Sequence, residues 1–241
     1  MAGLTLVIGN KNYSSWSMRP WVAMKQLGIP FDEVKLRFHS QEWDAQIARW
    51  SPSRLVPVLW RGDQSVWDSL AILETLHEWF PDRGVWPGDP LARAFARSVA
   101  AEMHSGFRDL RANMPMNIRA ALPGKGMNPE VQANVDRIQA LWGEARRRFG
   151  HAGPEAVERG AGPEAVERGA GPFLFGHFCA ADAMYAPVVM RFATYGVQLA
   201  PEASAYCEAM RAAAGVRAWI DDALRETEIV PEDEPYATAA P

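Results

Sequence analysis

The first eighty or so residues combine strand-like and helix-like hydrophobic patterns. Leu4–Ile8 is a short, almost continuous apolar run, which is typical of a buried parallel strand. The apolar spacing from Ser15 to Leu27 predicts a helix, and Gly28 follows it as a C-terminal cap would. Similar patterns predict strands at residues 31–38, 56–61 and 65–67 and helices at residues 43–50 and 68–80. The predicted order is therefore βαβα followed by ββα.

A stretch rich in proline and glycine, Pro81–Pro90, precedes a second part in which only helical patterns occur. We interpret it as a linker between two domains, at residues 1–82 and 91–230. Apolar stripes at steps of three and four residues predict the helices of the second domain. The first stripe contains Leu91, Phe95, Val99, Met103, Phe107 and Leu110, and the second contains Val131, Val135, Ile138, Trp142 and Phe149. Later helices are predicted at residues 183–195, 203–214 and 216–224.

Two further segments carry no helical or strand pattern. The nonapeptide GPEAVERGA occupies residues 153–161 and recurs letter for letter at residues 162–170. Two copies are too few for a stacked repeat fold, so we interpret them as a duplication in a surface loop, where insertions cost little. The acidic tail after Pro231 is predicted to be disordered.

The composition excludes several classes of function. The chain has 241 residues and a net charge of -4, without a dense Lys/Arg tract, so a nucleic-acid partner is not expected. It has two cysteines, Cys179 and Cys207, and no Cys-x-x-Cys motif, which disfavours disulfides, metal sites and two-cysteine redox chemistry. Neither a signal peptide nor a membrane span is recognised, since polar residues interrupt the most apolar stretch, Phe173–Met190. We therefore expect a cytoplasmic globular protein.

Four motifs occur in the same order as the predicted elements. They are YSSWSMRP at residues 13–20, PSRLVPVL at 52–59, VWDSLAI at 66–72 and GHFCAADA at 176–183. With them, residues 1 to about 230 resemble a soluble glutathione S-transferase of the serine type, with a Ser-Ser pair similar to that of the zeta class. The resemblance implies an α/β thioredoxin-like N-terminal domain that binds glutathione, and an all-α C-terminal domain that forms the electrophile pocket. It also implies a homodimer.

The Ser-Ser pair supplies the candidate catalytic residues, Ser14 and Ser15. The glutathione thiolate is the nucleophile, and a serine hydroxyl is too weak a base to remove the thiol proton. A hydroxyl can instead donate a hydrogen bond to the sulfur anion, beside the partial positive charge of the helix N-terminus. Ser14 is our first choice for this contact and Ser15 the second. The alternative is that either serine only caps the helix.

Three more positions are expected near the tripeptide. Trp16 either forms a wall of the substrate pocket or belongs to the core. The resemblance implies a cis peptide bond between Val56 and Pro57. It would turn the Val56 N–H and C=O toward the cysteinyl backbone of glutathione, like the edge of a strand. The alternative is an ordinary trans proline at the start of a strand.

Asp68 and Ser69 stand at the start of a predicted helix. A helix N-terminus with the Ser69 hydroxyl suits the γ-glutamyl carboxylate, and Asp68 is placed to reach the ammonium group. The alternative is that Asp68 is only an N-cap, although both roles can coexist. Arg19 lies one helical turn after Ser15, where it either binds a substrate carboxylate or makes a structural ion pair; we favour the ion pair.

The sequence departs from the family pattern at two places. Arg54-Leu55 stands where Gly-Lys is common, and Cys179 stands where the helix-opening box usually has Ser or Thr, which cap more strongly. Phe107, Met114 and Met116 either line the cleft between the domains or belong to a core stripe.

The leading functional hypothesis is a glutathione transferase that activates the thiol for attack on small electrophiles. One alternative is a glutathione-dependent cis–trans isomerase of the maleylacetoacetate type, although Trp16 replaces the cysteine usual after the Ser-Ser pair. The other is a glutathione-binding protein without catalysis, because the usual Gly-Lys is missing.

Overall fold

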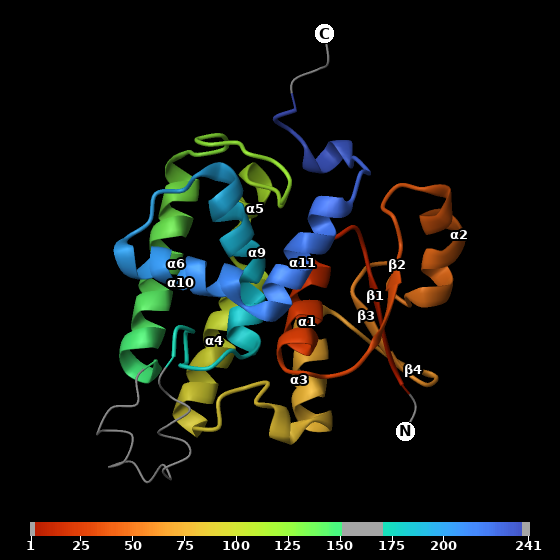
Figure 1. The fold of residues 1–241 in the computed structure, drawn as a ribbon, viewed down its shortest axis with the longest axis horizontal. Helices are drawn as coiled ribbons and strands as arrows, with labels where there is room; N and C mark the ends of the chain where they lie inside the picture. The colour runs from red at the N-terminus through yellow and green to blue at the C-terminus, as the bar shows by residue number, and fades with distance from the viewer. Residues whose placement is uncertain (1–2, 151–170, 238–241) are drawn as a thin grey trace.

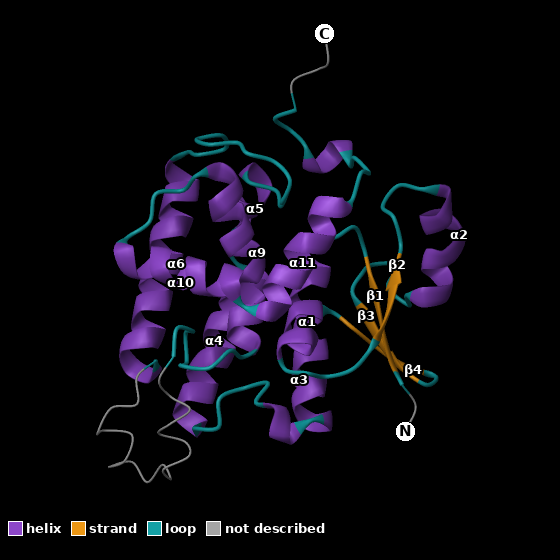
Figure 2. Ribbon diagram, viewed as in Figure 1, coloured by secondary structure: helices purple, strands orange, loops and turns teal. Residues whose placement is uncertain are grey.

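A mixed sheet of four strands forms the first part of the computed structural model, which describes residues 3–150 and 171–237 (Figure 2). The strand order is β2-β1-β3-β4, with the labels of Figure 1. β1 pairs in parallel with β2 and antiparallel with β3, and β3 pairs antiparallel with β4. The strands are β1 (Leu4–Ile8), β2 (Asp32–Lys35), β3 (Val58–Arg61) and β4 (Gln64–Trp67).

Helices cover both faces of this sheet (Figure 1). They are α1 (Ser15–Gln26), α2 (Gln41–Trp50) and α3 (Ser69–Trp79). Successive side chains of a strand point to opposite faces, so Leu6 and Ile8 of β1 join the large core with α1 and α3. Val7 lies in a smaller cluster with Ile47 of α2. The order of elements and their layering confirm the predicted thioredoxin-like fold.

The second part is helical, as predicted. Its elements are η1 (Pro81–Arg83), α4 (Pro90–Ser105), α5 (Arg108–Asn113), α6 (Pro129–Phe149), α9 (Ala180–Tyr195), α10 (Pro201–Ala212), α11 (Ala214–Arg225) and η2 (Pro231–Asp233). α1 packs against both α9 and α11, so the large core runs without a break from the sheet into the helical part. No helix of the described ranges is long and apolar enough to cross a membrane.

The first predicted stripe is divided between two helices. Gly106 ends α4, and Phe107 adopts a φ of 54°, so the chain turns before α5 begins. The assignment of Leu91 to the buried stripe is wrong, because this residue of the first α4 turn is 61% exposed.

The stretch Pro81–Pro90, interpreted as a linker, connects α3 to α4 and packs into the molecule, because Val85 and Trp86 are buried and the Val85 carbonyl accepts a 2.7 Å hydrogen bond from the Ala180 amide. The expectation of a disordered tail is corrected. The tail after Pro231 is ordered through residue 237, and the Tyr236 hydroxyl donates a 2.7 Å hydrogen bond to the Asn113 carbonyl. Composition signals turns and polarity, but it does not reveal the apolar anchors that hold such segments. The duplicated nonapeptide lies outside the described residues.

Candidate active site

A cavity of about 460 Å³ lies where the start of α1 meets α5, α9 and the segment before β3. It brings together four of the predicted site residues, Ser14, Ser15, Trp16 and Val56. Pro57, Asp68 and Ser69 are not part of its lining. The volume is in the range of small-molecule sites, so the predicted serine pair opens into a space that fits a ligand.

The Ser14 hydroxyl is engaged inside the protein. It caps α1 by accepting a 3.4 Å hydrogen bond from the Ser17 amide, and it donates a 2.7 Å hydrogen bond to Ser17 Oγ. Ser17 Oγ in turn accepts a hydrogen bond from the Gly9 amide at the end of β1. The capping role considered for the two serines therefore holds for Ser14, and its hydroxyl proton is donated to Ser17 Oγ.

Ser15 is the first residue of α1, and its hydroxyl differs from that of Ser14 in its hydrogen bonds. Its Oγ accepts a 3.3 Å hydrogen bond from Arg191 Nη2. Within the described ranges its hydroxyl proton has no acceptor. The geometry thus favours Ser15, our second choice from the sequence, as the donor that is free to point at a ligand.

The peptide bond between Val56 and Pro57 is cis, as predicted. In the part of the chain that the structure describes, the Val56 N–H and C=O have no hydrogen-bond partner. A backbone pair of this kind at a cavity wall can be bound by an extended peptide. Arg54, two residues earlier, is exposed and has a φ of 59°.

Asp68 caps α3, as one of its two predicted roles requires. Its Oδ1 accepts from the amides of Leu70 and Ala71 at 2.8 and 3.4 Å, and its Oδ2 lies 2.7 Å from Nε2 of His104. Burial raises the pKa of Asp68, but the His104 contact and these amides outweigh it and leave the pKa lowered. Ser69 Oγ is buried without a partner. Ligand roles for Asp68 and Ser69 stay predictions.

Trp16 lines the cavity and is surrounded by basic side chains. The Arg19 guanidinium carbon lies 4.0 Å from its ring centroid, and that of Arg111 lies 5.6 Å away. The His104 ring meets it edge-on at 5.3 Å. Arg19 is fully buried, and none of its three nitrogens has a hydrogen-bond partner. The ion pair favoured for Arg19 is therefore wrong.

Sequence reasoning missed three residues of this site, Arg111, Arg191 and His104. Arg191 had a signal, since it is the only basic residue in α9, a helix that is otherwise almost entirely apolar. Arg111 had a weaker one, because it follows Leu110 at the end of an apolar stripe. Of the three residues expected at the cleft or in the core, Met116 lines the cavity, whereas Phe107 and Met114 are buried in the core.

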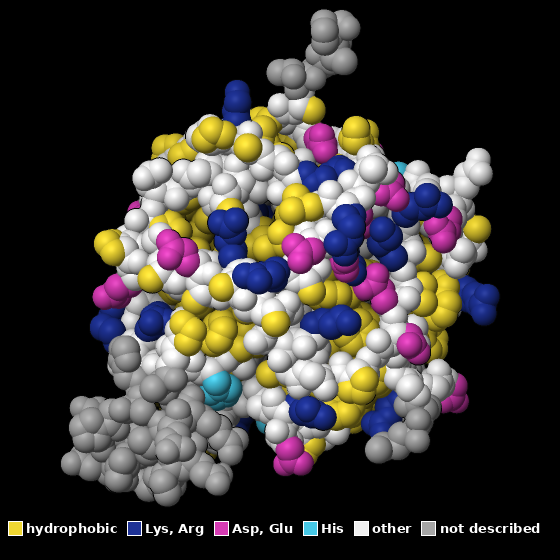
Figure 3. All heavy atoms as spheres, viewed as in Figure 1, with side chains coloured by type: hydrophobic (Ala, Val, Ile, Leu, Met, Phe, Trp, Pro, Cys, Tyr) yellow, Lys and Arg dark blue, Asp and Glu magenta, His cyan; other side chains and the backbone are white. Residues whose placement is uncertain are grey.

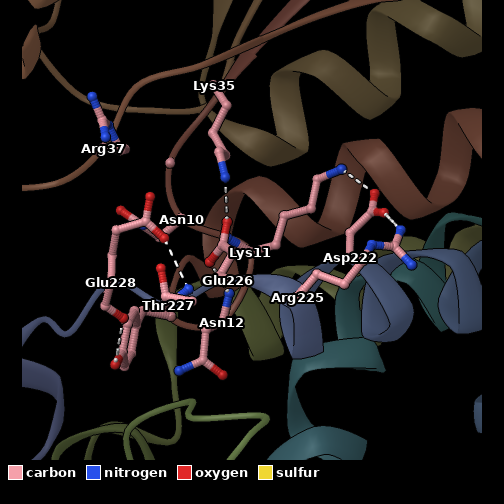
Figure 4. A network of polar contacts seen from close by, with 12 residues as sticks. Asn10, Lys11, Asn12, Lys35, Arg37, Asp222, Arg225, Glu226, Thr227 and Glu228 are labelled. Carbon is pink, nitrogen blue, oxygen red and sulfur yellow. Dashed lines mark hydrogen bonds and ion pairs between the residues drawn. The ribbon is translucent and has the colours of Figure 1, made fainter.

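The segment after α11 holds the loop that precedes the serines (Figure 4). The Glu226 carboxylate accepts hydrogen bonds from the backbone amides of Lys11 and Asn12 at 2.8 and 3.0 Å, and Lys35 Nζ lies 2.9 Å from it. Lys11 Nζ pairs with Asp222 at 2.5 Å and with Glu33 at 2.7 Å. We call these contacts the C-terminal clamp.

A second cavity, of about 400 Å³, is lined by the charged residues of the clamp. Acidic and basic side chains gather beside one another on this face of the molecule, over α11 and the neighbouring part of the sheet (Figure 3). Because Lys11 and Lys35 already pair with carboxylates, this cavity belongs to the clamp and offers no free charge of theirs to a ligand.

The ordered tail reaches the first cavity. Asp233 lines it, and Glu234 accepts a hydrogen bond from the Tyr13 hydroxyl, which also accepts one from Arg119 Nη2 at 2.9 Å. Burial and the contact with Glu234 raise the pKa of Tyr13, so its hydroxyl stays neutral. With its proton donated to Glu234, Tyr13 does not compete with Ser15 as a donor to a ligand.

Comparisons with known proteins agree with this geometry. Residues 13–79 match the family model of the glutathione S-transferase N-terminal domain. A probable maleylacetoacetate isomerase of Caenorhabditis elegans is 33% identical over 96 residues, which are 40% of this chain and 44% of that protein. The chain thus matches less than half of the length of this curated relative.

Solved structures share the whole fold. A glutathione transferase omega 2S of Trametes versicolor aligns with a TM-score of 0.65 at 19% identity, covering 97% of this chain and 99% of that one. A glutathione transferase homologue from Burkholderia, with bound glutathione, aligns with a TM-score of 0.62 at 22% identity, covering 92% and 98%. Human glutathione S-transferase T1-1 aligns with a TM-score of 0.61 at 19% identity, covering 92% and 90%.

Proposed function

We propose that this chain is a member of the glutathione S-transferase superfamily, because residues 13–79 match the model of its N-terminal domain and the fold is that of solved glutathione transferases. We propose further that it binds glutathione as a co-substrate and transfers it to small electrophiles. The observation that carries the proposal is the free hydroxyl of Ser15 at the N-terminus of α1, beside the cationic Arg191. We also propose that the protein is a cytoplasmic homodimer.

The chemistry at Ser15 is stabilisation of an anion. The Ser15 hydroxyl would donate a hydrogen bond to the glutathione sulfur, while the α1 N-terminus and Arg191 contribute positive potential. All three favour the thiolate over the thiol and so lower the pKa of the bound thiol. The thiol proton passes to solvent, the sulfur lone pair forms a C–S bond, and the leaving group departs with the electron pair of its bond to carbon.

Binding of the tripeptide follows from the other predicted residues. The unpaired N–H and C=O of Val56 fit the backbone of the cysteinyl residue, with the cis Pro57 behind them. The N-terminus of α3, with the unpartnered Ser69 hydroxyl, suits the γ-glutamyl carboxylate. Asp68 is available to the ammonium through the carboxylate that His104 also contacts.

The test is the Ser15→Ala variant with Ser14→Ala as its matched control. A hydrogen bond to a charged group contributes about 1.5–3 kcal/mol, so turnover with a generic electrophile should fall roughly 10- to 150-fold in Ser15→Ala. The pKa of the bound thiol, followed by ultraviolet absorbance of the thiolate, should rise by about 1–2 units. If Ser14→Ala shows the lower turnover and the higher thiol pKa, and Ser15→Ala shows neither change, the assignment of the two serines is reversed.

The relative from Caenorhabditis elegans favours a second candidate, a glutathione-dependent cis–trans isomerase. In that reaction the thiolate adds to a conjugated double bond, the bond rotates, and the thiolate leaves unchanged. Product analysis separates the two activities, since conjugation consumes glutathione and isomerisation does not. Retention on immobilised glutathione without either activity would favour the third candidate, a glutathione-binding protein without catalysis.

A further inference from the structure

Positive charge at one wall of the cavity exceeds what the described residues neutralise. Arg111 of α5 and Arg191 of α9 line the cavity, and Arg19 of α1 stacks on Trp16, which also lines it. In residues 3–150 and 171–237, no carboxylate lies within 4.0 Å of any of the three guanidinium groups. Three guanidinium groups from three different helices therefore converge without a paired carboxylate.

Their hydrogen bonds go to neutral groups. Arg191 donates to the carbonyls of Met114 and Pro187 at 2.8 and 3.3 Å, in addition to Ser15 Oγ. Arg111 donates to the His104 carbonyl at 3.1 Å, which leaves most of its donors free. These contacts orient the guanidinium groups but do not balance their charge.

Such an arrangement is costly, since buried charges are ordinarily paired. Burial and repulsion from Arg191 and Arg111 lower the pKa of Arg19 to about 9. Burial and repulsion from Arg111 lower the pKa of Arg191 to about 10. Both groups thus remain charged at neutral pH, and a destabilised charge cluster in a cavity is typical of a functional site.

The acidic side chains nearby do not supply the missing charge. Asp233 lines the cavity but lies more than 4.0 Å from every guanidinium group of the described residues, so one unpaired carboxylate stands against the two arginines of the lining. Asp68 is already bound by His104 and by the amides of α3. The lining of the cavity therefore keeps an excess of positive charge, alongside apolar side chains such as those of Phe38 and Trp43.

We propose that the second substrate of this protein carries a carboxylate, which Arg111 and Arg191 bind while its electrophilic carbon faces Ser15. Guanidinium groups match carboxylates in shape and charge and bind them with paired hydrogen bonds. Arg19 contributes charge at short range through its position against Trp16. This inference rests on the proposed function, because it names the class of electrophile for the same site.

A matched pair of electrophiles tests it. One is a chlorodinitrobenzoate with chlorine para to the carboxylate, and the other is its methyl ester, which has the same reacting carbon but no charge. Each catalysed rate is divided by the uncatalysed rate with glutathione, since the ester is intrinsically more reactive. The wild type should favour the acid over the ester, and the acid-to-ester ratio of kcat/KM should fall about tenfold or more in Arg111→Ala.

Two further variants make the result specific. Arg111→Lys keeps the charge but loses the paired donors, so the ratio should lie between those of wild type and Arg111→Ala. Arg108→Ala removes an exposed arginine of the same helix that does not line the cavity, and it should leave the ratio unchanged. Equal ratios in wild type and Arg111→Ala would overturn the inference.

The same anion could instead be a carboxylate of glutathione. In that case Arg111→Ala would weaken glutathione binding, measured by calorimetry, and would lower the rates of both electrophiles alike; this result also overturns the inference.

Binding of the electrophile without glutathione tests the carboxylate site separately from the proposed function. Quenching of tryptophan fluorescence by the acid but not the ester, lost in Arg111→Ala, would uphold the carboxylate site even if no conjugate forms. Equal quenching by both compounds would refute the site.

Discussion

The C-terminal clamp predicts that a residue far from the sulfur controls both the stability and the rate of this protein. Glu226 is 7% exposed, and its two carboxylate oxygens accept separately from the amides of Lys11 and Asn12. Glu226→Ala would leave these two buried N–H groups without partners. An orphaned buried donor costs about 1–3 kcal/mol, so we expect unfolding in urea to show a loss of roughly 2–6 kcal/mol.

The rate should fall as well, because the two amides lie within four residues of Ser15. A displacement of about 1 Å at a reacting group can cost about a hundredfold, so kcat for conjugation should fall by roughly 10- to 100-fold at temperatures where the variant is folded. Glu226→Gln should be intermediate. Its single amide oxygen can serve only one of the two N–H groups, while its amide nitrogen would face the other.

Glu232→Ala is the matched control from the same segment. Its side chain is 65% exposed, and Nε2 of His39 lies 3.8 Å from its carboxylate. We expect its stability to change by less than about 0.5 kcal/mol, as for most surface substitutions. If Glu226→Ala is as stable and as active as this control, then the serine loop is held by something other than the clamp, and the reasoning fails.

Three more predictions concern the framework of the site. Ser14→Ala should lose about 0.5–2 kcal/mol of stability in denaturant titration, as other lost N-caps do, with little change in the pKa of the bound thiol. Burial raises the pKa of Asp182 to about 6, above its unfolded value of about 4. The folded state therefore binds the proton more tightly, and the free energy of unfolding should fall by roughly 2–3 kcal/mol as the pH rises from 4 to 6. This decrease should be absent in Asp182→Asn. Gly215→Ala should cost about 1–3 kcal/mol, because a Cβ would lie 3.0 Å from the Val22 carbonyl of α1, whereas Gly88→Ala, with open space around it, should be neutral in the same thermal melts.

Local patterns were enough to predict the sheet and the first three helices, because each depends on neighbours in the chain, whereas the cis Pro57 was implied by the family resemblance. β1 has the predicted bounds, and β3 begins two residues later than predicted. The order of the four motifs led to the same fold class that the solved structures share. Long-range contacts explain what the patterns missed. Leu91 is exposed and Trp86 is buried, and the neighbour of Trp86, Val85, accepts a hydrogen bond from Ala180 far along the chain.

In the candidate site too, some features follow from local sequence and others depend on long-range contacts. The positions of Ser14, Ser15, Trp16 and Val56 around one cavity follow from the motifs, but the difference between the two serines does not. It depends on Arg191, which lies 176 residues from Ser15 along the chain. Hydrophobic periodicity would assign an arginine in α9 to the surface, so its burial beside a hydroxyl becomes visible only once α1 and α9 are packed together.

The clamp also sets the order in which this site can be assembled during synthesis. Lys11 and Glu226 are 215 residues apart, and a ribosome adds about 5–20 residues per second, so the serine loop leaves the ribosome roughly 10–40 seconds before its carboxylate partner. During that interval the sheet and α1 can form, but the Lys11 and Asn12 amides have only water to bind. In a nascent chain the loop before Ser15 therefore lacks its two hydrogen bonds to the Glu226 carboxylate until the segment after α11 has been translated.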